Sequence, residues 1–481
     1  MTRYFLCFIV FLLPFNLSAE QWSALHSLLP KGTQLSYIVT DPLKKRVITQ
    51  SQQEILRTPA SMQKLLTAAA AKLYLGDDFR YQTTIEGQKS RISRRSYQGD
   101  LTFRFVGDPT LLRADISTML NSLKRLNIKQ INGDLLLNET HFNGYQWSNG
   151  QAWNDLGVCY TAPSSAIVIN KNCVLGNLSL SKSDAEKATL YIPSYEPVDI
   201  SSDVSVVTAQ QREEQFCDLE VTRNSQNRYH LWGCMVPRNR AFPLAFAVND
   251  PFEYAQQIIS DELQKAGIKI SGQVKLDNSN KKDIKEQILV SHHSPALSEM
   301  LRTMMKESDN LIADSLFKTL GAAYFNTSGN FRNGGQALKL ILLEHGIDLE
   351  NAYLADGSGL SRHNLMSAEL FMSVLNYVYL NDNKLNLLST FSVAGIDGTL
   401  QYHQALRRDL FKSKIIAKTG SMKGVTNLLG IVKSLQGDRL FVLILNGYNT
   451  ESSGKNKTEP KYHFEQAFFE KMMSSTSAVT K

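Results

Sequence analysis

The alternation of apolar and polar positions divides the chain into segments with different secondary structure. Residues 34–40 and 45–49 are strand-like and flank Asp41-Pro42, so they predict a hairpin. From about residue 80, short apolar runs separated by Gly, Asn and Asp continue for about 200 residues, which predicts a strand-rich region. Its predicted strands lie at residues 81–85, 100–106, 133–137, 165–169, 188–192, 204–208 and 229–232.

Helical spacing returns after this region, and strands follow it. The predicted helices lie at 254–266, at 297–305 after a cap at Ser294, at 311–320 and at 368–380. Three consecutive antiparallel strands, joined by tight turns, are predicted at 414–418, 426–432 and 439–445. Residues 462–473 are amphipathic but carry no basic face, which favours a helix packed on the sheet over a membrane-surface helix.

Length and composition fit an exported protein with more than one domain. A chain of 481 residues is too long for one ordinary core, and 43% apolar with 20% charged residues is typical of a soluble globular protein. The net charge of +7 is compatible with anionic cell-wall surfaces. No basic cluster argues for nucleic acid as a partner.

The first residues predict export. Residues 1–19 have a positive start at Arg3, a short apolar run and a small residue at Ala19, as a cleaved signal peptide has. Cys7 lies inside the apolar run, which argues against a lipoprotein. No later run of 18 apolar residues is present, so no transmembrane anchor is expected. The predicted location is the periplasm.

Four cysteines remain after removal of the signal peptide. An even number in an exported chain favours disulfides, and three pairings are possible. We predict Cys159–Cys173 and Cys217–Cys234, because each closes a short local loop. Unpaired thiols are the alternative. The cysteine and histidine spacings fit no zinc site, so neither a metal nor a cofactor is predicted.

Candidate chemistry begins at Ser61-Met62-Gln63-Lys64. Thr58 is the predicted N-cap and Pro59 the first residue of a helix that Gly76 ends. Residues three apart share a helix face, so the Ser61 hydroxyl and the Lys64 amine can meet. A neutral lysine can take the proton of a serine nucleophile. Alone, this spacing is a weak signal, since many such pairs are solvated helix surface.

Two distant motifs strengthen it. Ser308-Asp309-Asn310 lies between two predicted helices, and Lys418-Thr419-Gly420 closes a predicted strand. The three motifs in this order are typical of β-lactamases and penicillin-binding proteins. We predict Ser61 as nucleophile and Lys64 as general base, neutral because it is buried and faces Lys418.

The downstream motifs receive the remaining roles. Ser308 is predicted to relay a proton, and Asn310 to orient Lys64 and bind the substrate amide. The predicted carboxylate-binding and substrate-binding residues are Lys418, Thr419, Gly420 and Ser421. The oxyanion hole is predicted to combine the N–H of Ser61 with one from residues 420–422.

With these residues, the chain resembles the class C low-molecular-mass penicillin-binding proteins, serine peptidase family S13. The resemblance extends over nearly the whole mature chain. It includes Trp153-Asn154-Asp155, residues 356–362 (DGSGLSR), residues 397–400 (DGTL) and the long gap between Ser61 and Ser308. No Glu-x-x-Leu-Asn segment, which class A β-lactamases use for deacylation, lies between residues 310 and 418.

The resemblance implies an α+β fold, with a β-lactamase/transpeptidase-like body and two nested β-rich inserted domains. The implied divisions are 20–80 with 290–481 for the body, 81–162 with 245–289 for the first insertion, and 163–244 for the nested one. It also implies covalent reaction with β-lactams and a possible homodimer. Asp155 resembles a position near the family's active-site entrance, where it would bind a diaminopimelate ammonium; otherwise it caps a turn.

The sequence therefore predicts a periplasmic serine DD-peptidase. It would remove terminal D-Ala from peptidoglycan peptides and cleave D-Ala-diaminopimelate cross-links through an acyl-serine intermediate. One alternative is a β-lactamase, in which water reaches the acyl-enzyme quickly. The other is a catalytically silent scaffold that binds peptidoglycan.

Overall fold

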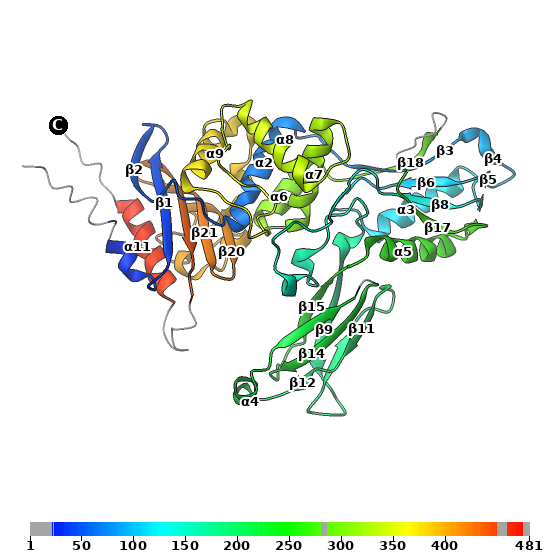
Figure 1. Ribbon diagram of the computed structural model, residues 1–481, viewed down its shortest axis with the longest axis horizontal. Helices are drawn as coiled ribbons and strands as arrows, with labels where there is room; N and C mark the ends of the chain where they lie inside the picture. Colours follow the sequence, from blue (N-terminus) through cyan, green and yellow to red (C-terminus); the bar gives the residue numbers. More distant parts are fainter. Residues whose placement is uncertain (1–21, 23, 225, 280–285, 450–458, 475–481) are drawn as a thin grey trace, which may run out of the picture.

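The structure is a computed structural model that describes residues 22, 24–224, 226–279, 286–449 and 459–474. Figure 1 shows a body of helices and strands at one side, and two strand-rich extensions beside it. The predicted signal peptide, residues 1–19, lies outside the described residues. None of the described helices is both long and apolar enough to cross a membrane.

One six-stranded antiparallel sheet forms the centre of the body, and both ends of the chain contribute to it. Its strand order is β19-β20-β21-β22-β1-β2. The bounds are β1 Gln34–Asp41, β2 Arg46–Ser51, β19 Ser392–Val393, β20 Ile415–Met422, β21 Val425–Ser434 and β22 Gly437–Asn446. Pairing of β1 with β22 closes the body across the insertion. The predicted hairpin and the three predicted C-terminal strands are confirmed.

Alternation along β1 places apolar side chains on both faces of the sheet. Ile38 points into a core formed with the helices of the body, whereas Tyr37 and Val39 point into a core on the other face. The body helices are α2 Lys64–Tyr74, α6 Leu297–Lys306, α7 Asn310–Phe325, α8 Phe331–Leu343, α9 Ala368–Leu380 and α10 Asp382–Leu385. On the second face lie η1 Ala24–Leu28 and α11 Pro460–Ser474.

Helix α11 packs on the sheet, as its sequence predicts. Phe464, Phe468, Phe469 and Met472 are fully buried in the core that includes Tyr37 and Val39. Phe468 meets Tyr37 edge to face, with ring centroids 5.7 Å apart. The apolar stripe of this helix is therefore occupied by the protein itself.

The first extension has two sheets with the orders β17-β8-β6-β3-β18 and β16-β7-β5-β4. Its strands are β3 Gln82–Gly87, β4 Ile92–Ser93, β5 Ser96–Gln98, β6 Leu101–Arg104, β7 Gln130–Asn132, β8 Leu135–Asn138, β16 Lys269–Ile270, β17 Val274–Asp277 and β18 Gln287–His293. Helices α3 Arg113–Arg125 and α5 Pro251–Ala266 share one apolar core with these sheets. Chain segments on both sides of residues 163–244 thus build one unit.

The second extension branches from the first. Its strands are β9 Cys173–Leu180, β10 Ala188–Tyr191, β11 Asp199–Ser202, β12 Ser205–Val206, β13 Leu219–Arg223, β14 Arg228–Met235 and β15 Phe242–Ala247, with α4 Ala209–Glu214. Its buried core is small, with Leu178, Val204, Leu231 and Met235. The domain limits given by the resemblance stay a prediction.

Both predicted cysteine pairs lie at disulfide distance in the structure. Cys159 and Cys173 have Cα atoms 5.3 Å apart, and Cys217 and Cys234 have theirs 5.8 Å apart. The second pair tethers the loop after α4 to β14 in an extension that has a small core of its own. A disulfide stabilises such a unit chiefly by restricting its unfolded chain.

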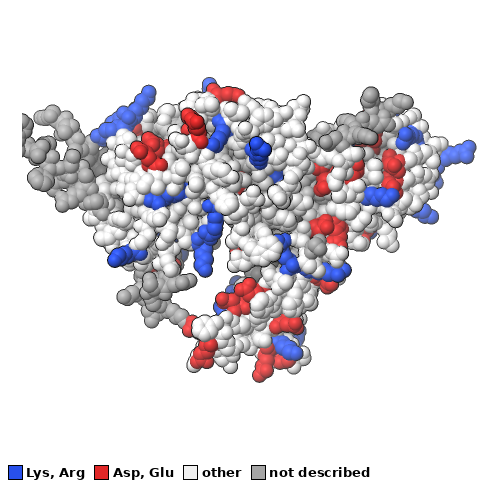
Figure 2. Space-filling view, viewed as in Figure 1, with Lys and Arg blue, Asp and Glu red and all other residues white. Residues whose placement is uncertain are grey.

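Some sequence predictions differ from the structure. Residues 165–169 are buried but form no strand. Ser294 does not cap α6, whose N-cap is Ala296; its hydroxyl instead accepts the N–H of Tyr81 at 2.9 Å. Helices α3 and α8 are absent from the predicted elements. On the face drawn in Figure 2, acidic and basic side chains are interspersed, without a broad field of one sign.

Candidate active site

Ser61 lies in a 3-10 turn, η2 (Ala60–Gln63), that leads into α2. The predicted helix start is therefore wrong in detail, because Pro59 occupies the N-cap position of η2 without a side-chain cap. Thr58 does not cap, and its backbone groups bind two strand asparagines instead. Its N–H donates to Asn446 Oδ1 at 2.9 Å, and its carbonyl accepts from Asn427 Nδ2 at 3.0 Å.

The turn carries a left-handed backbone at Ala60, where φ is +49°. That conformation costs a residue with a Cβ about 1 kcal/mol, so the surrounding structure must hold it. Asn427 Nδ2 also donates to the Pro59 carbonyl at 2.9 Å, directly before Ala60. A Cβ at Gly359 would lie 1.9 Å from the Ala60 carbonyl oxygen, so this glycine lets its loop close over the turn. These contacts fix the direction of the Ser61 side chain.

The Lys64 amine meets three oxygens. Its Nζ lies 2.8 Å from Ser61 Oγ, 2.6 Å from Asn310 Oδ1 and 2.8 Å from the Ser358 carbonyl oxygen. The amide and carbonyl oxygens can only accept, so they take two N–H bonds. A neutral amine has two such hydrogens and one lone pair. The lone pair then faces Ser61, whose hydroxyl can donate to it.

Burial weakens the proton affinity of Lys64. The side chain is fully buried, and this desolvation lowers its pKa from 10.5 to about 8 against the opposing charges of Asp314, Asp356 and Asp309. Lys418, also fully buried, has its pKa held well below the usual range, first by desolvation and then by Lys64. Of the two causes predicted from the sequence, burial is therefore the main one for Lys64, and Lys418 is not among the charges that shift its pKa.

Ser308 and Lys418 meet on the other side of the site. Lys418 Nζ donates to Ser308 Oγ at 2.9 Å and to the Thr419 carbonyl at 3.1 Å. Ser308 has a left-handed backbone, with φ of +61°, between the end of α6 and the start of α7. Thr419 Oγ1 donates to Thr399 Oγ1 at 2.9 Å, which brings residues 397–400 to the same strand.

The Lys418-Thr419-Gly420 motif lies inside β20 rather than at its end. Strand β19 pairs with β20 only at Ile416 and Ala417. On that side, the part of the chain that the structure describes gives no strand partner to β20 from Lys418 onward. A free strand edge of this kind can take an extended peptide.

The structure explains why position 420 is a glycine. A Cβ there would lie 2.7 Å from the Pro59 carbonyl oxygen and 3.1 Å from the Met62 backbone nitrogen. The glycine therefore lets β20 approach the Ser61 turn of this chain. Ser421, the next residue, is exposed.

We expect Gly420→Ala to separate β20 from the Ser61 turn. The added methyl group must push against backbone atoms, which rearrange at a cost of about 1–3 kcal/mol. Acylation by penicillin should slow at least about tenfold, measured by stopped-flow fluorescence, with a lower Tm by calorimetry. Gly424→Ala is the matched control for the added methyl group, because a Cβ there meets nothing within 4 Å, although its φ of +77° is also unfavourable for alanine. Equal acylation rates in the two variants would contradict this account.

Asn310 connects Lys64 to the inserted region. Its Nδ2 donates to the Tyr160 carbonyl at 2.8 Å, while its Oδ1 holds Lys64. Burial, followed by a hydrogen bond to Asp155, raises the pKa of the Tyr160 hydroxyl. Asp155 closes the short turn η4 (Trp153–Asp155) and is half-buried. The structure thus places Asp155 beside the segment that holds Asn310.

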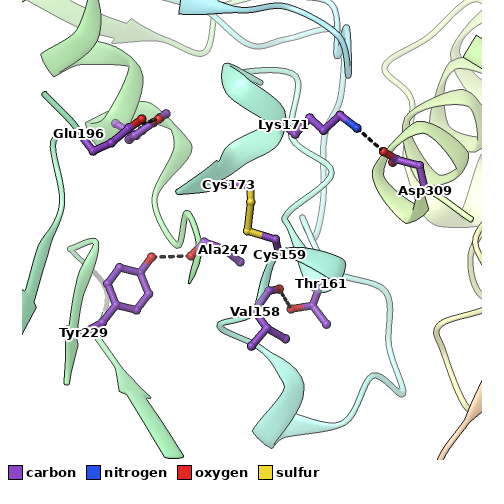
Figure 3. Close-up of a disulfide and its surroundings, with 10 residues drawn as sticks. Val158, Cys159, Thr161, Lys171, Cys173, Glu196, Tyr229, Ala247 and Asp309 are labelled. Atoms are coloured by element: carbon purple, nitrogen blue, oxygen red, sulfur yellow. Dashed lines mark hydrogen bonds and ion pairs between the residues drawn. A yellow bond between two sulfur atoms is a disulfide. The ribbon is translucent and has the colours of Figure 1, made fainter. Parts of the chain in front are cut away.

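A second link lies next to it. Figure 3 shows Lys171 reaching Asp309, with Nζ and Oδ2 2.8 Å apart, close to the Cys159–Cys173 disulfide. Asp309 is the N-cap of α7 and accepts the N–H of Ile312 at 3.0 Å. One carboxylate thus caps the helix that carries Asn310 and ties this helix to the insertion.

Three site residues escaped the sequence analysis. Ser358 supplies a carbonyl to Lys64, and both Asp314 and Asp356 are buried behind it. Asp356 and Ser358 belong to the segment 356–362 quoted for the family resemblance, but no role followed from it. Asp314 lies four residues after Asn310 on α7, and this spacing is the signal that could have found it. Among the described residues, no group of acidic, cysteine and histidine side chains could hold a metal ion.

The fold and the site are those of a serine-type peptidase. A family model described as the D-Ala-D-Ala carboxypeptidase 3 (S13) family matches residues 23–468, so the chain belongs to that family. It is 37% identical over 446 residues, 92% of each chain, to the D-alanyl-D-alanine carboxypeptidase DacB of Haemophilus influenzae. It is 26% identical to the D-alanyl-D-alanine carboxypeptidase of Actinomadura sp. strain R39, covering 81% of this chain and 73% of the relative.

Solved structures agree. The crystal structure of penicillin binding protein 4 (dacB) from Haemophilus influenzae matches with a TM-score of 0.88 and 36% identity, covering 94% of this chain and 99% of that one. A structure of the same protein complexed with a novel β-lactam matches with a TM-score of 0.83. The chain is therefore a serine-type D-Ala-D-Ala carboxypeptidase, a hydrolase with the α+β fold of penicillin-binding proteins.

Proposed function

We propose that Ser61 is the nucleophile of a DD-peptidase that removes terminal D-Ala from peptidoglycan stem peptides and also cleaves D-Ala-diaminopimelate cross-links. The observation that carries this proposal is the contact between Lys64 Nζ and Ser61 Oγ at 2.8 Å, with the two hydrogens of the neutral amine directed to Asn310 and Ser358. An amine held in this way presents its lone pair to the hydroxyl before substrate arrives.

In the proposed reaction, Lys64 takes the Ser61 proton as Oγ attacks the carbonyl carbon before the terminal D-Ala. The resulting oxyanion is held by the N–H of Ser61 and one N–H from residues 420–422 of β20. The proton then passes through Ser308 to the leaving amine, and the C–N bond breaks. Water hydrolyses the acyl-serine ester by the reverse proton path, which restores Ser61.

Substrate binding uses the free part of β20. A C-terminal carboxylate is bound by Lys418 and Thr419, and Ser421 lies further along the same edge. Lys418 is fully buried and bonded only to hydroxyl and carbonyl oxygens in the described chain. A carboxylate beside it would raise its pKa and secure its charge. Asp155, beside Tyr160, is proposed to bind the ammonium group of diaminopimelate.

Lys64 also predicts the pH dependence of acylation. Only its neutral form accepts the proton, and its pKa is about 8. Below pH 8 the neutral fraction falls about tenfold for each pH unit. We expect the second-order rate constant for benzylpenicillin, whose carboxylate stays ionised, to fall about tenfold from pH 7 to pH 6. A rate that stays flat from pH 5 to pH 8 would contradict a neutral Lys64.

Penicillins should acylate this site covalently. The solved relative complexed with a β-lactam shares 35% of its sequence with this chain and supports the proposal. A β-lactamase would turn penicillin over rapidly, whereas a peptidase keeps a long-lived adduct. A scaffold that binds peptidoglycan without chemistry would give no adduct.

Cross-link cleavage needs its own experiment. Purified cross-linked muropeptide dimers are incubated with the protein and the products are weighed by mass spectrometry. We expect monomers, together with free D-Ala from pentapeptide stems. Release of D-Ala without monomers would limit the activity to carboxypeptidase action. Intact dimers and pentapeptides would contradict the proposed function.

Location and assembly belong to the same proposal. A cleaved segment near Ala19 would place the mature protein in the periplasm, which cell fractionation tests by finding the shorter form with periplasmic markers. Its absence from that fraction would contradict the assignment. The homodimer that the family resemblance implies is tested by light scattering of the purified mature protein.

A further inference from the structure

Asp314 lies on one face of α7, between Asn310, which bonds to Lys64, and Lys318. Asn310 lies four residues before it and Lys318 four residues after it, so the three side chains follow one another along the helix. Asp314 and Lys318 are both buried, at 6% and 1% exposure. A buried carboxylate next to a catalytic amine is costly unless it is bonded, so its partners show what it does.

The Asp314 carboxylate holds the loop that faces Lys64. Its Oδ1 accepts the N–H groups of Gly357 at 3.0 Å and Ser358 at 2.8 Å. Its Oδ2 accepts the Ser358 hydroxyl at 3.2 Å. The carbonyl of the same Ser358 accepts from Lys64 Nζ at 2.8 Å. Asp314 therefore holds both the backbone N–H and the hydroxyl of Ser358, and the carbonyl of this residue is one of the three oxygens around the Lys64 amine.

Three donors aimed at one carboxylate favour its charged form. A negative charge behind Lys64 raises the proton affinity of the amine, opposing the burial that lowers it. Among the charges that oppose burial at Lys64, Asp314 has the largest effect, followed by Asp356 and Asp309. Burial, followed by the Asp356 charge, raises the pKa of Asp314 to about 8, whereas the Lys64 charge and the bonds from Ser358 lower it. Asp314 and Lys64 therefore titrate over the same pH range, and the charge of each acts on the other.

The other charged groups around Asp314 and Lys64 come from three elements. They are Asp309 and Lys318 on α7, Asp356 in the loop after α8 and Lys418 on β20. Lys318 gives its hydrogens elsewhere, with Nζ donating to the carbonyls of Tyr145 at 2.9 Å and Ser164 at 2.5 Å. Asp356 also acts on Lys64, but it belongs to the Ser358 loop itself and accepts the N–H of Gly359 there at 2.8 Å. Asp314 is the charged group on another element that contacts this loop and acts on Lys64.

We propose that Asp314 is a positioning residue of the active site, which places the Ser358 carbonyl against Lys64 and sets how readily that amine takes the Ser61 proton. Burial alone would leave Lys64 neutral but a weak base. The carboxylate restores part of its basicity while remaining out of contact with Ser61. This inference rests on the proposed role of Lys64 as general base.

Asp314→Asn tests it, because asparagine has the same shape. Its oxygen can still accept the N–H groups of Gly357 and Ser358, and its NH2 can donate to the Ser358 hydroxyl. The charge is lost, and the Ser358 hydroxyl changes from donor to acceptor in its bond to residue 314. We expect the midpoint of the pH profile for acylation by benzylpenicillin to move down by about one pH unit. The plateau rate should fall severalfold, because a less basic amine accepts the proton less readily.

Ser315→Ala, on the same helix, is the control. The Ser315 side chain is fully buried and its hydroxyl has no hydrogen-bond partner in the described chain, so the variant leaves the Asp314 bonds and charge in place. Its pH midpoint should stay within about 0.3 units of the wild-type value. A lower plateau in Asp314→Asn with an unchanged midpoint would show a merely structural role and overturn the proposal. Loss of all acylation in wild type would instead overturn the proposed function.

A reciprocal measurement needs no substitution at Asp314. The carboxyl carbon of Asp314 is followed by NMR in protein labelled at aspartate, for wild type and for Lys64→Met. Coupling between two sites is the same in both directions. The Asp314 midpoint should therefore rise by about one unit when the amine is absent. An unchanged midpoint overturns the proposal even if Asp314→Asn does not fold.

Discussion

Replacing Lys64 by methionine should lower the rate of acylation by benzylpenicillin about 10²–10⁴-fold, the usual contribution of a general base. Methionine has a similar length and tolerates a fully buried site, so the fold should persist. Without the amine, nothing within hydrogen-bond distance in the described chain is left to take the Ser61 proton. The rate is measured at pH 8 with a fluorescent penicillin, and Tm is recorded for each protein.

Lys72→Met is the control for Lys64→Met. Lys72 lies on the same helix and is also buried, but its amine pairs with Asp77 away from the site. Its substitution should change the acylation rate less than about threefold while it costs some stability. If Lys64→Met retained a tenth of the wild-type rate at equal Tm, another group would have to be the base.

Replacing Ser61 by alanine should abolish hydrolysis. The attacking oxygen is missing, and losing a serine nucleophile costs about 10⁶-fold in turnover. The Ser61 hydroxyl bonds only to Lys64 Nζ in the described chain, and the backbone bonds of the turn stay in place, so the variant should fold with a near-normal Tm. Release of D-Ala from a pentapeptide ending in D-Ala-D-Ala is measured with a coupled amino-acid oxidase assay.

Ser373→Ala is the control for Ser61→Ala, because Ser373 is an exposed serine on α9 whose hydroxyl bonds, in the described chain, only to the Leu370 carbonyl. It should release D-Ala at the wild-type rate. Hydrolysis by Ser61→Ala above about 1% of the wild-type rate would mean that a second nucleophile operates, because a loss of about 10⁶-fold leaves far less than that.

Local spacing in the sequence was enough to find the core of the site. Ser61 and Lys64 are one turn apart, so their contact needs little from the rest of the fold. The elements around Ser308 and Lys418 follow from clear helix and strand patterns. Their meeting with Lys64 could be expected only from the motif combination and the family resemblance, because 247 residues separate Ser61 from Ser308.

Other features depended on tertiary contacts that the sequence does not announce. Threonine is a common helix N-cap residue, which favoured Thr58 as the cap. In the structure, the backbone N–H and carbonyl of Thr58 are instead bonded to the side chains of Asn446 and Asn427 on the sheet. The helix is therefore preceded by the 3-10 turn η2, and this turn sets the direction of the Ser61 side chain. Competition between a local cap and a distant amide has no local signature.

Helix α8 was missed because of Gly334 and Gly335, which lower helix propensity and suggest a turn. The structure explains them by close packing. A Cβ at Gly334 would lie 2.4 Å from the Phe317 carbonyl oxygen on α7. The glycines therefore let two helices approach, which only the folded neighbour reveals. The strand predicted at residues 165–169 is absent from the structure. These residues are buried, but a buried apolar run need not pair as a strand.

The central claim is that Ser61 forms a covalent acyl-enzyme, and mass spectrometry of the protein after incubation with benzylpenicillin tests it most directly. The account predicts that the intact mass rises by one penicillin, and that peptide mapping places the adduct on Ser61. The adduct should persist long enough to isolate, and Ser61→Ala should gain no mass. An unmodified wild-type protein, or an adduct mapped to any other residue, would contradict the account.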